Sequence, residues 1–140
     1  MRITAKIARL VRGARGSVAV EFALFTPFFL MLLFGVVELG GAWFQRQMLV
    51  SASREGARLG SLLNDAENSA AKVEQTVRNY LTQAGYPGQL SVVTSGTDGA
   101  TGTQVRVTVT SPYRFPVLGS LVPDQLASVT LRAVTIMRHE

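Results

Sequence analysis

The chain has 140 residues, of which 47% are hydrophobic and only 16% are charged, and it contains no cysteine. This length allows one small domain with an appendage, and the composition argues against long-range disorder. The lack of cysteine excludes a disulfide scaffold, a thiolate metal site and a catalytic cysteine. The net charge of +5 resides in residues 1–16, which carry five basic and no acidic side chains. Because the rest of the chain is neutral, the charge pattern does not favour nucleic-acid binding.

A membrane span is predicted near the N-terminus, because residues 22–37 contain no charged or amide side chain. Extending this segment to Phe44 gives the roughly 20 residues that a spanning helix needs, so we place the span at about 18–44. Trp43 then lies at the membrane interface, and Glu38 is expected to snorkel to it. A buried core helix is the alternative, but a domain of this size rarely encloses a helix that is apolar on every side.

The distribution of basic residues predicts the orientation of this span. Five basic side chains precede it, whereas Arg46, Arg54 and Arg58 follow it together with acidic residues. The N-terminus should therefore be cytoplasmic, with residues 62–140 on the far side of the cytoplasmic membrane. Arg54 and Arg58, one helical turn apart, are expected on a solvated face. The competing interpretation is a secretory signal peptide, but the apolar stretch exceeds the usual length of that region.

After the span, residues 45–63 contain no proline and can extend the helix, which we predict over 17–61. Ala52, Gly56 and Gly60 recur at every fourth position in this extension. Two interpretations of this small-residue stripe stay open. The stripe either lets another backbone approach closely, or its two glycines merely weaken the end of the helix.

Residues 62–140 are predicted to form a small α+β domain that begins with an amphipathic helix. Gly85 and Pro87 end this helix. Its apolar residues recur at helical spacing and should face the core, namely Val73, Val77, Tyr80, Leu81 and Ala84.

An antiparallel sheet of about three strands should follow. The β-branched segments 89–95 and 103–111 predict a hairpin, and the alternate valines of the second segment predict one buried face. Residues 112–125 contain three prolines and are expected to form an irregular connection. A third strand is predicted at 126–137, in a central position because both of its faces are partly apolar.

Enzyme signatures are scarce in this sequence, which contains none of the common nucleotide-binding, hydrolase or metal-binding motifs. His139 is the only histidine, and its place next to the C-terminus predicts a solvated side chain. Asp98 and Asp124 occur in contexts typical of turns. We therefore expect a protein that is not an enzyme and that has no metal site or cofactor.

Glu21 stands out, because it is a carboxylate at the edge of the predicted span. Its burial in a bilayer costs a few kcal/mol unless it reaches water or a positive partner. The residues leave two interpretations open. Glu21 is either a functional charge or an interfacial residue of the first helical turns, where the helix dipole favours an acid.

The sequence around this glutamate resembles the TadE-like minor pilins, a family of the Tad (type IVc, Flp) pilus assembly system. The resemblance is specific over about residues 12–60. It rests on Gly16, on Glu21 five positions later, on residues 21–24 leading to Pro27, and on residues 34–40 and 53–58. In two places the chain differs from the usual pattern: Ser53 replaces an alanine, and Ser17 replaces the phenylalanine of most type IV pilins.

The resemblance implies a pilin-like fold, with a long N-terminal transmembrane helix before the extracytoplasmic domain. It implies that residues 1–16 form a basic cytoplasmic leader, which a prepilin peptidase removes between Gly16 and Ser17. It also implies a bacterial inner-membrane location and pilus partners: other minor pilins, the major Flp pilin, the assembly platform and the lipid bilayer. The roughly 80 residues beyond the helix favour a minor pilin or pseudopilin that helps assemble or initiate the pilus and supports adhesion.

The resemblance also assigns a role to Glu21. Cleavage creates an amine at Ser17, about one helical turn from Glu21, and Glu21 of one subunit can pair with that amine of its neighbour. Pro27 is expected to free the carbonyl of Ala23 and to permit a kink. Position at the pilus tip, in the shaft or only in the assembly complex stays open. The alternative function is a membrane-anchored extracytoplasmic binding domain unrelated to pili.

Overall fold

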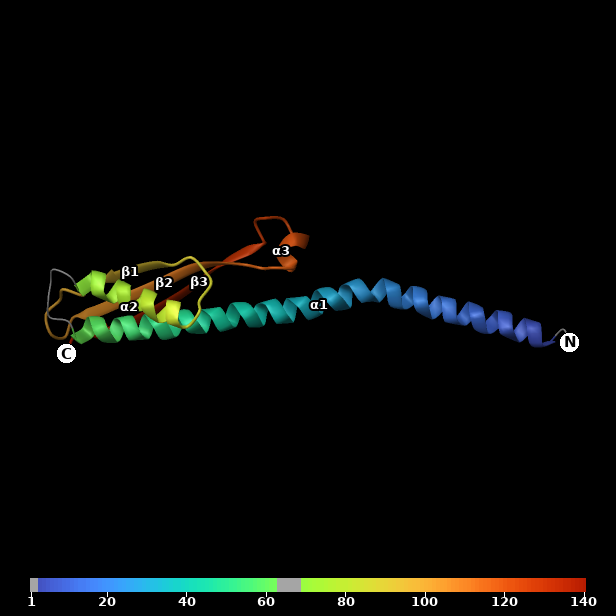
Figure 1. The fold of residues 1–140 in the computed structure, drawn as a ribbon, viewed down its shortest axis with the longest axis horizontal. Coiled ribbons are helices and arrows are strands. Elements are labelled where there is room, and N and C mark those ends of the chain that lie inside the picture. The colour runs from blue at the N-terminus through green and yellow to red at the C-terminus, as the bar shows by residue number, and fades with distance from the viewer. Residues whose placement is uncertain (1–2, 63–68) are drawn as a thin grey trace. The chain divides into compact units, whose positions relative to one another are not determined.

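The computed structural model describes residues 3–62 and 69–140, with side chains from residue 16 onward. The basic side chains of the predicted leader lie outside this part. The described elements are, in chain order, α1 (Ile3–Leu62), α2 (Ser69–Gln83), β1 (Ser91–Ser95), β2 (Gln104–Arg114), α3 (Leu118–Leu121) and β3 (Ser128–Arg138) (Figure 1). A long N-terminal helix, a second helix and a three-stranded antiparallel sheet confirm the predicted α+β class.

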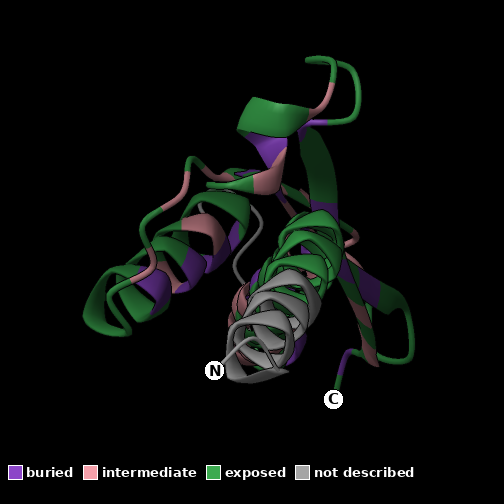
Figure 2. Cartoon of the chain, turned by 90° about the vertical axis from the view of Figure 1, so that its right-hand side faces the viewer, coloured by how far each residue is buried: buried purple, intermediate pink, exposed green. Residues whose placement is uncertain are grey.

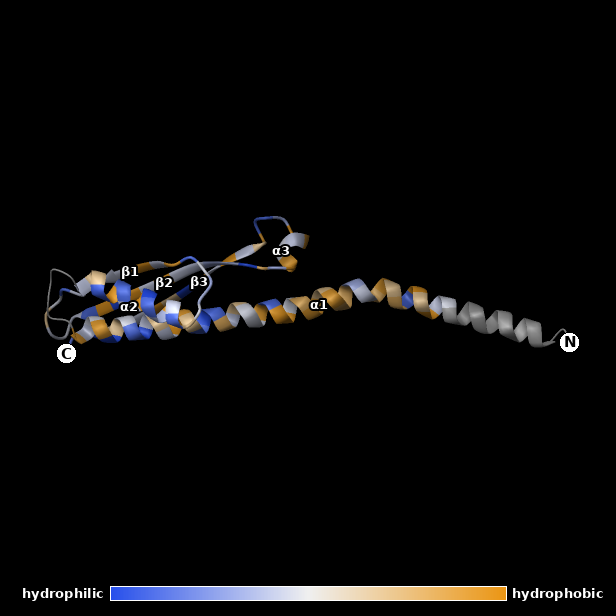
Figure 3. Cartoon of the chain, viewed as in Figure 1, coloured by the Kyte–Doolittle hydropathy of each residue, from blue (hydrophilic) through white to orange (hydrophobic). Residues whose placement is uncertain are grey.

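The chain divides into two compact units, the first of which ends at Val37. In this unit, hydrophobic residues dominate α1 from residue 16 onward (Figure 3). Their side chains are exposed, as Phe22 at 72% and Phe28 at 71% show. The part of α1 from Gly16 to Leu62 is long and apolar enough to cross a membrane. Such an apolar surface is stable only in lipid or against other apolar surfaces.

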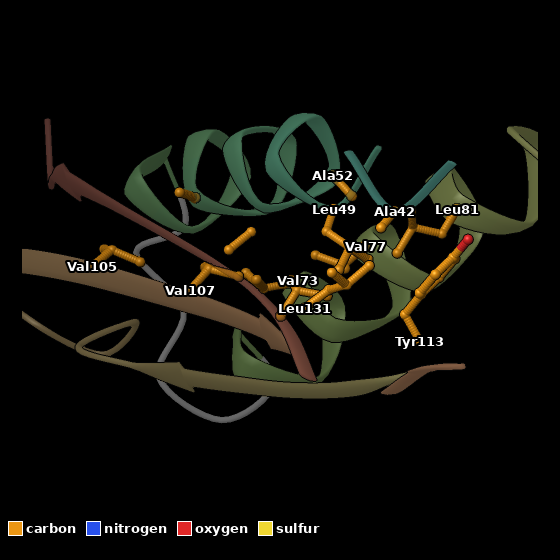
Figure 4. Packing of buried hydrophobic residues seen from close by; sticks show 13 residues of the cluster. Ala42, Leu49, Ala52, Val73, Val77, Leu81, Val105, Val107, Tyr113 and Leu131 are labelled. Atoms are coloured by element: carbon orange, nitrogen blue, oxygen red, sulfur yellow. The ribbon is translucent and has the colours of Figure 1, made fainter. Parts of the chain in front are cut away.

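The second unit, Glu38–Glu140, contains the hydrophobic core. The C-terminal part of α1 and the helix α2 pack against one face of the sheet, and buried residues gather between them (Figure 2). Figure 4 shows how side chains from both helices and from β2 and β3 meet in this core. Its members are Ala42, Leu49, Ala52, Ala57, Val73, Val77, Leu81, Val105, Val107, Val109, Tyr113, Leu131 and Ala133.

The unit begins at Glu38 and not at the predicted boundary after residue 61. The reason is that Leu49, Ala52 and Ala57 of α1 are completely buried in the core. Sequence alone marks the helix as continuous, but which turns of it the domain covers depends on tertiary packing.

The amphipathic pattern of α2 is confirmed. Val73, Val77 and Leu81 lie one turn apart on one face and are completely buried. Tyr80 is 39% exposed, and Ala84 lies beyond the end of the helix. Gly85 follows with a φ of 71°, a left-handed conformation that favours glycine after a helix C-terminus.

The sheet has the order β1-β2-β3, with both pairs antiparallel. The predicted hairpin is confirmed, and the alternate valines of β2 point into the core. β2 is longer than predicted, because it continues through Pro112 to Arg114. Ser91, the first residue of β1, pairs with Thr110, so β1 does not reach as far as Pro112. Proline has no N–H to donate to a neighbouring strand, and it is tolerated here because no strand lies on that side.

The predicted central position of the third strand is wrong, because β3 lies at the edge of the sheet. Its core-facing residues Leu131 and Ala133 are buried, as the pattern indicated. Its other face, with Val134 and Ile136, is exposed, since no described element covers that side of the sheet. An apolar pattern on both faces therefore does not fix the number of neighbours that a strand has.

Candidate functional site

The predicted processing segment lies on the exposed surface of α1. Gly16, Ser17 and Glu21 are all exposed. Glu21 follows Ser17 by four residues, which is about one helical turn. A Cβ placed on Gly16 would meet no atom within 4 Å, so no described contact within the chain requires a glycine there. Glycine costs about 1 kcal/mol in a helix relative to alanine.

Pro27 lies inside α1, as predicted from the sequence, within a helix that continues on both sides. The hydroxyl of the preceding Thr26 donates a hydrogen bond to the carbonyl of Phe22, at 2.6 Å. Proline has no N–H for the carbonyl of Ala23 and makes the helix locally easier to bend.

Glu38 does not snorkel, contrary to the prediction, because its side chain is bound by the domain. It is only 6% exposed. Its Oε1 accepts hydrogen bonds from the main-chain N–H groups of Val117 and Leu118, and Oε2 accepts a second one from Leu118 at 3.3 Å. Val117 and Leu118 lie where the chain enters α3, so the carboxylate satisfies two N–H groups that the short helix leaves free.

Tyr113 makes a second contact with the same turn of α1. Its hydroxyl donates a hydrogen bond to the main-chain carbonyl of Glu38, at 3.3 Å. Gly41 makes this approach possible, because a Cβ at that position would lie 3.0 Å from the hydroxyl oxygen. Phe115 packs edge-to-face on the Tyr113 ring, with centroids 5.4 Å apart. Burial, and secondly the charge of Glu38, raises the pKa of Tyr113, which keeps its hydroxyl a donor.

The stripe of small residues faces the interior of the domain. Ala52 is completely buried, and both glycines lie against valine side chains of α2 and β2. A Cβ on Gly56 would lie 2.5 Å from a methyl of Val77, and one on Gly60 would lie 2.9 Å from a methyl of Val105. The stripe thus lets α2 and β2 approach the axis of α1 closely.

Arg54 and Arg58 lie on the exposed side of α1, as predicted. Arg58 forms a salt bridge with Glu55 at 2.8 Å, and hydrogen bonding from its guanidinium lowers the pKa of Glu55. Because both partners are exposed, this pair adds little stability.

His139 is buried, contrary to the prediction of a solvated side chain, with 3% of its surface exposed. The main chain explains this, since its N–H donates to the carbonyl of Thr103 and its own carbonyl accepts from Gly102, which continues the pairing of β2 with β3. Its Nε2 donates to the carbonyl of Gly96, at 3.0 Å. Asp98 and Asp124 lie in turns, as expected.

Comparison with known families gives one match, in which residues 16–58 match the TadE-like protein family. The match confirms the resemblance predicted from the motifs. The matched segment begins at Gly16, includes Glu21 and Glu38, and is similar to TadE-like proteins. No curated protein and no solved structure matches the chain in the corresponding comparisons. This similarity of residues 16–58 suggests involvement in a Tad pilus.

Proposed function

We propose that the chain is a minor pilin or pseudopilin that helps assemble or initiate a Tad pilus and thereby supports adhesion and surface attachment. The observation that carries this proposal is the segment Gly16–Glu21. The family match begins at Gly16, and Glu21 is an exposed carboxylate at the start of an apolar helix. Prepilin peptidase acts between Gly16 and Ser17, and the mature chain begins with the amine of Ser17.

In the assembled state, Glu21 of one subunit binds the Ser17 amine of its neighbour. The chain has no Lys or Arg between Ser17 and Gln45 that Glu21 could bind instead. Burying such a pair contributes little net stability, whereas leaving either charge unpaired is costly, so the pair acts chiefly to set the register between subunits. The role is therefore structural and non-enzymatic, and its partners are other minor pilins, the major Flp pilin and the assembly platform.

The contacts of Glu38 suggest a shorter span than the predicted 18–44. A span of residues 18–37 has 20 residues, a length of about 30 Å, which equals the thickness of the hydrocarbon core. Trp43 and Phe44 are 62% and 66% exposed and can lie at the interface. We place the N-terminus in the cytoplasm and the compact unit from Glu38 onward outside the inner membrane.

Processing is the direct test. Co-expression with the prepilin peptidase of the native host should remove 16 residues, so that the mature chain begins at Ser17. Replacement Gly16→Leu should block the cut, because a pocket that approaches the backbone closely has no room for a side chain. Gly40→Leu is a matched control, since Gly40 also has no atom within 4 Å of a Cβ, and it should be processed normally. Intact mass and N-terminal sequencing give the result. A mature terminus near Trp43 would indicate an ordinary signal peptide and contradict the proposal.

A further inference from the structure

Within residues 3–62 and 69–140, no segment pairs with the outer edge of β3. Among the described residues, no main-chain hydrogen bond joins Ser128–Arg138 to any segment other than β2. Two main-chain hydrogen bonds, one at each end of the β2–β3 pair, show which residues bond across it: His139 donates to Thr103, and Phe115 donates to Ala127. The register between β2 and β3 is unbroken from one end to the other. Odd-numbered residues of β3 therefore bond to β2, and the N–H and C=O groups of even-numbered residues point to the free edge.

The even-numbered side chains also form the outer face of the sheet. Val134 and Ile136 are 41% and 45% exposed there, between Arg132 and Arg138. Arg106 of β2 pairs with Ile136 across the strands and adds a third guanidinium to this face. The three strands contain no acidic residue, and the described residues provide no carboxylate within salt-bridge distance of these three arginines. An apolar centre between unpaired cations thus borders an open strand edge.

We propose that this edge binds an extended acidic segment of another protein, which adds to the sheet as a fourth strand beside β3. Main-chain groups of the even-numbered residues supply the hydrogen bonds, and the outer-face side chains supply the selectivity. Carboxylates opposite Arg132 and Arg138, with two apolar side chains opposite Val134 and Ile136, complement the face. This spacing is acid-x-apolar-x-apolar-x-acid, which reads the same in both chain directions.

The same arginines disfavour pairing of β3 with a second copy of itself. Symmetric antiparallel pairing would bring the arginines of two β3 strands, together with the neighbouring Arg106 residues, onto one face without a carboxylate. Like charges close together across strands are destabilising. Basic side chains on an edge strand are a known protection against self-association. Here they also favour a partner of negative charge.

The test uses the full chain in nanodiscs of zwitterionic lipid, with the synthetic peptides GETVTVTEG and GKTVTVTKG as probes. Only the acidic peptide should bind. Its binding should slow amide hydrogen exchange at Thr130, Arg132, Val134 and Ile136, whose N–H groups point to the free edge. The alternate amides, which already bond to β2, should change little. This parity distinguishes strand addition from a diffuse attraction between charges.

Charge reversal tests the selectivity. Replacing both Arg132 and Arg138 with glutamate should weaken binding of the acidic peptide roughly tenfold and permit binding of the basic one. Arg54→Glu, on the exposed side of α1, is the matched control and should leave both affinities unchanged. Val134→Pro removes one outward N–H and should abolish binding, whereas Val134→Thr should retain it. Circular dichroism verifies the fold of each variant, and the charge reversal tests the proposal without a backbone change.

Three results would overturn the proposal. The first is equal binding of the two peptides, or no binding of the acidic peptide at millimolar concentration. The second is slowed exchange that does not follow the even-numbered residues of β3. The third is protection of these amides that grows with protein concentration in the absence of peptide, which would identify a second copy as the occupant.

Discussion

The carboxylate of Glu38 accepts a hydrogen bond at 3.1 Å from the main chain of Leu118, which lies 80 residues later in the sequence. A single acidic residue of α1 thereby holds the connection between β2 and β3. The hydrogen bond from Tyr113 to the Glu38 carbonyl anchors β2 to the same turn. Glu38 thus fixes the end of the domain that contains α3, where residues distant in sequence meet.

Glu38→Ala should lower the free energy of unfolding of the domain by about 1–3 kcal/mol. The substitution leaves the N–H groups of Val117 and Leu118 without their acceptor in a partly buried place. Glu38→Gln keeps one acceptor oxygen and should cost less. Glu55→Ala is the control, because that exposed carboxylate should contribute less than about 0.5 kcal/mol. Denaturant titration of the full chain in micelles measures these changes, and an unaltered midpoint for Glu38→Ala would remove the anchoring role.

Gly56→Ala should destabilise the domain by about 1–3 kcal/mol, although alanine is the better helix former. The new Cβ would lie 2.5 Å from a methyl of Val77, a stiff side chain that is completely buried. Gly40→Ala places the same group in open space and should be neutral or stabilising. Adding Val77→Ala to Gly56→Ala should restore part of the loss. Thermal melts of the three variants show whether close packing or helix propensity dominates.

Residues 38–140 should fold cooperatively when expressed without the apolar segment, whereas residues 62–140 should not. The shorter fragment lacks Leu49, Ala52 and Ala57, which are buried against α2 and the sheet. A domain this small has little core to spare and no disulfide to compensate. Circular dichroism and a melting curve compare the two fragments. A cooperative melt of 62–140 would return the domain boundary to the end of α1.

Alkaline pH should destabilise the domain through Tyr113. Its pKa in the folded state lies above the ordinary value of 10.0. Above about pH 10 the unfolded chain therefore loses this proton first, binds fewer protons than the folded chain, and is favoured as the pH rises. Tyr113→Phe should reduce this dependence and, at neutral pH, should cost about 1 kcal/mol for the lost hydrogen bond. Melting temperatures between pH 8 and pH 11 give the slope, and Tyr80→Phe, at a partly exposed site, should leave it unchanged.

Glu21→Ala should leave insertion and folding intact and impair pilus assembly. Alanine is easier to place in a membrane helix, but the Ser17 amine of a neighbour would then lack its partner, at a cost of about 3–5 kcal/mol. Glu21→Gln conserves size and should fail nearly as badly if charge pairing is the purpose. Piliation and crosslinking to other pilins are measured in a host without the wild-type copy. Normal piliation by both variants at wild-type abundance would leave Glu21 as an interfacial residue.

Periodicity predicted the elements whose burial repeats regularly along the chain. The spacing of Val73, Val77 and Leu81 fixed α2, and the alternate valines of β2 fixed its inner face, because each pattern has a single geometric solution. Glu38 and His139 were misjudged, because their partners, Leu118 and Gly96, come from distant segments that only the tertiary fold brings near. For Glu38, the available signal was the nearby Gly41, because a glycine in a helix can mark a close approach of another segment.

The buried stripe on α1 limits how many neighbours this subunit can accept along its helix. Beyond Glu38, α2 and β2 already occupy the side of α1 that bears Gly56 and Gly60, and the side that remains open carries Arg54 and Arg58. Before Glu38, most of the described side chains are apolar, and the large apolar ones are exposed around the helix. In a filament of such subunits, the part of each helix before Glu38 would make mainly apolar contacts with its neighbours. The part after Glu38 would make ionic contacts. Detergent and salt should therefore loosen different parts of the same assembly.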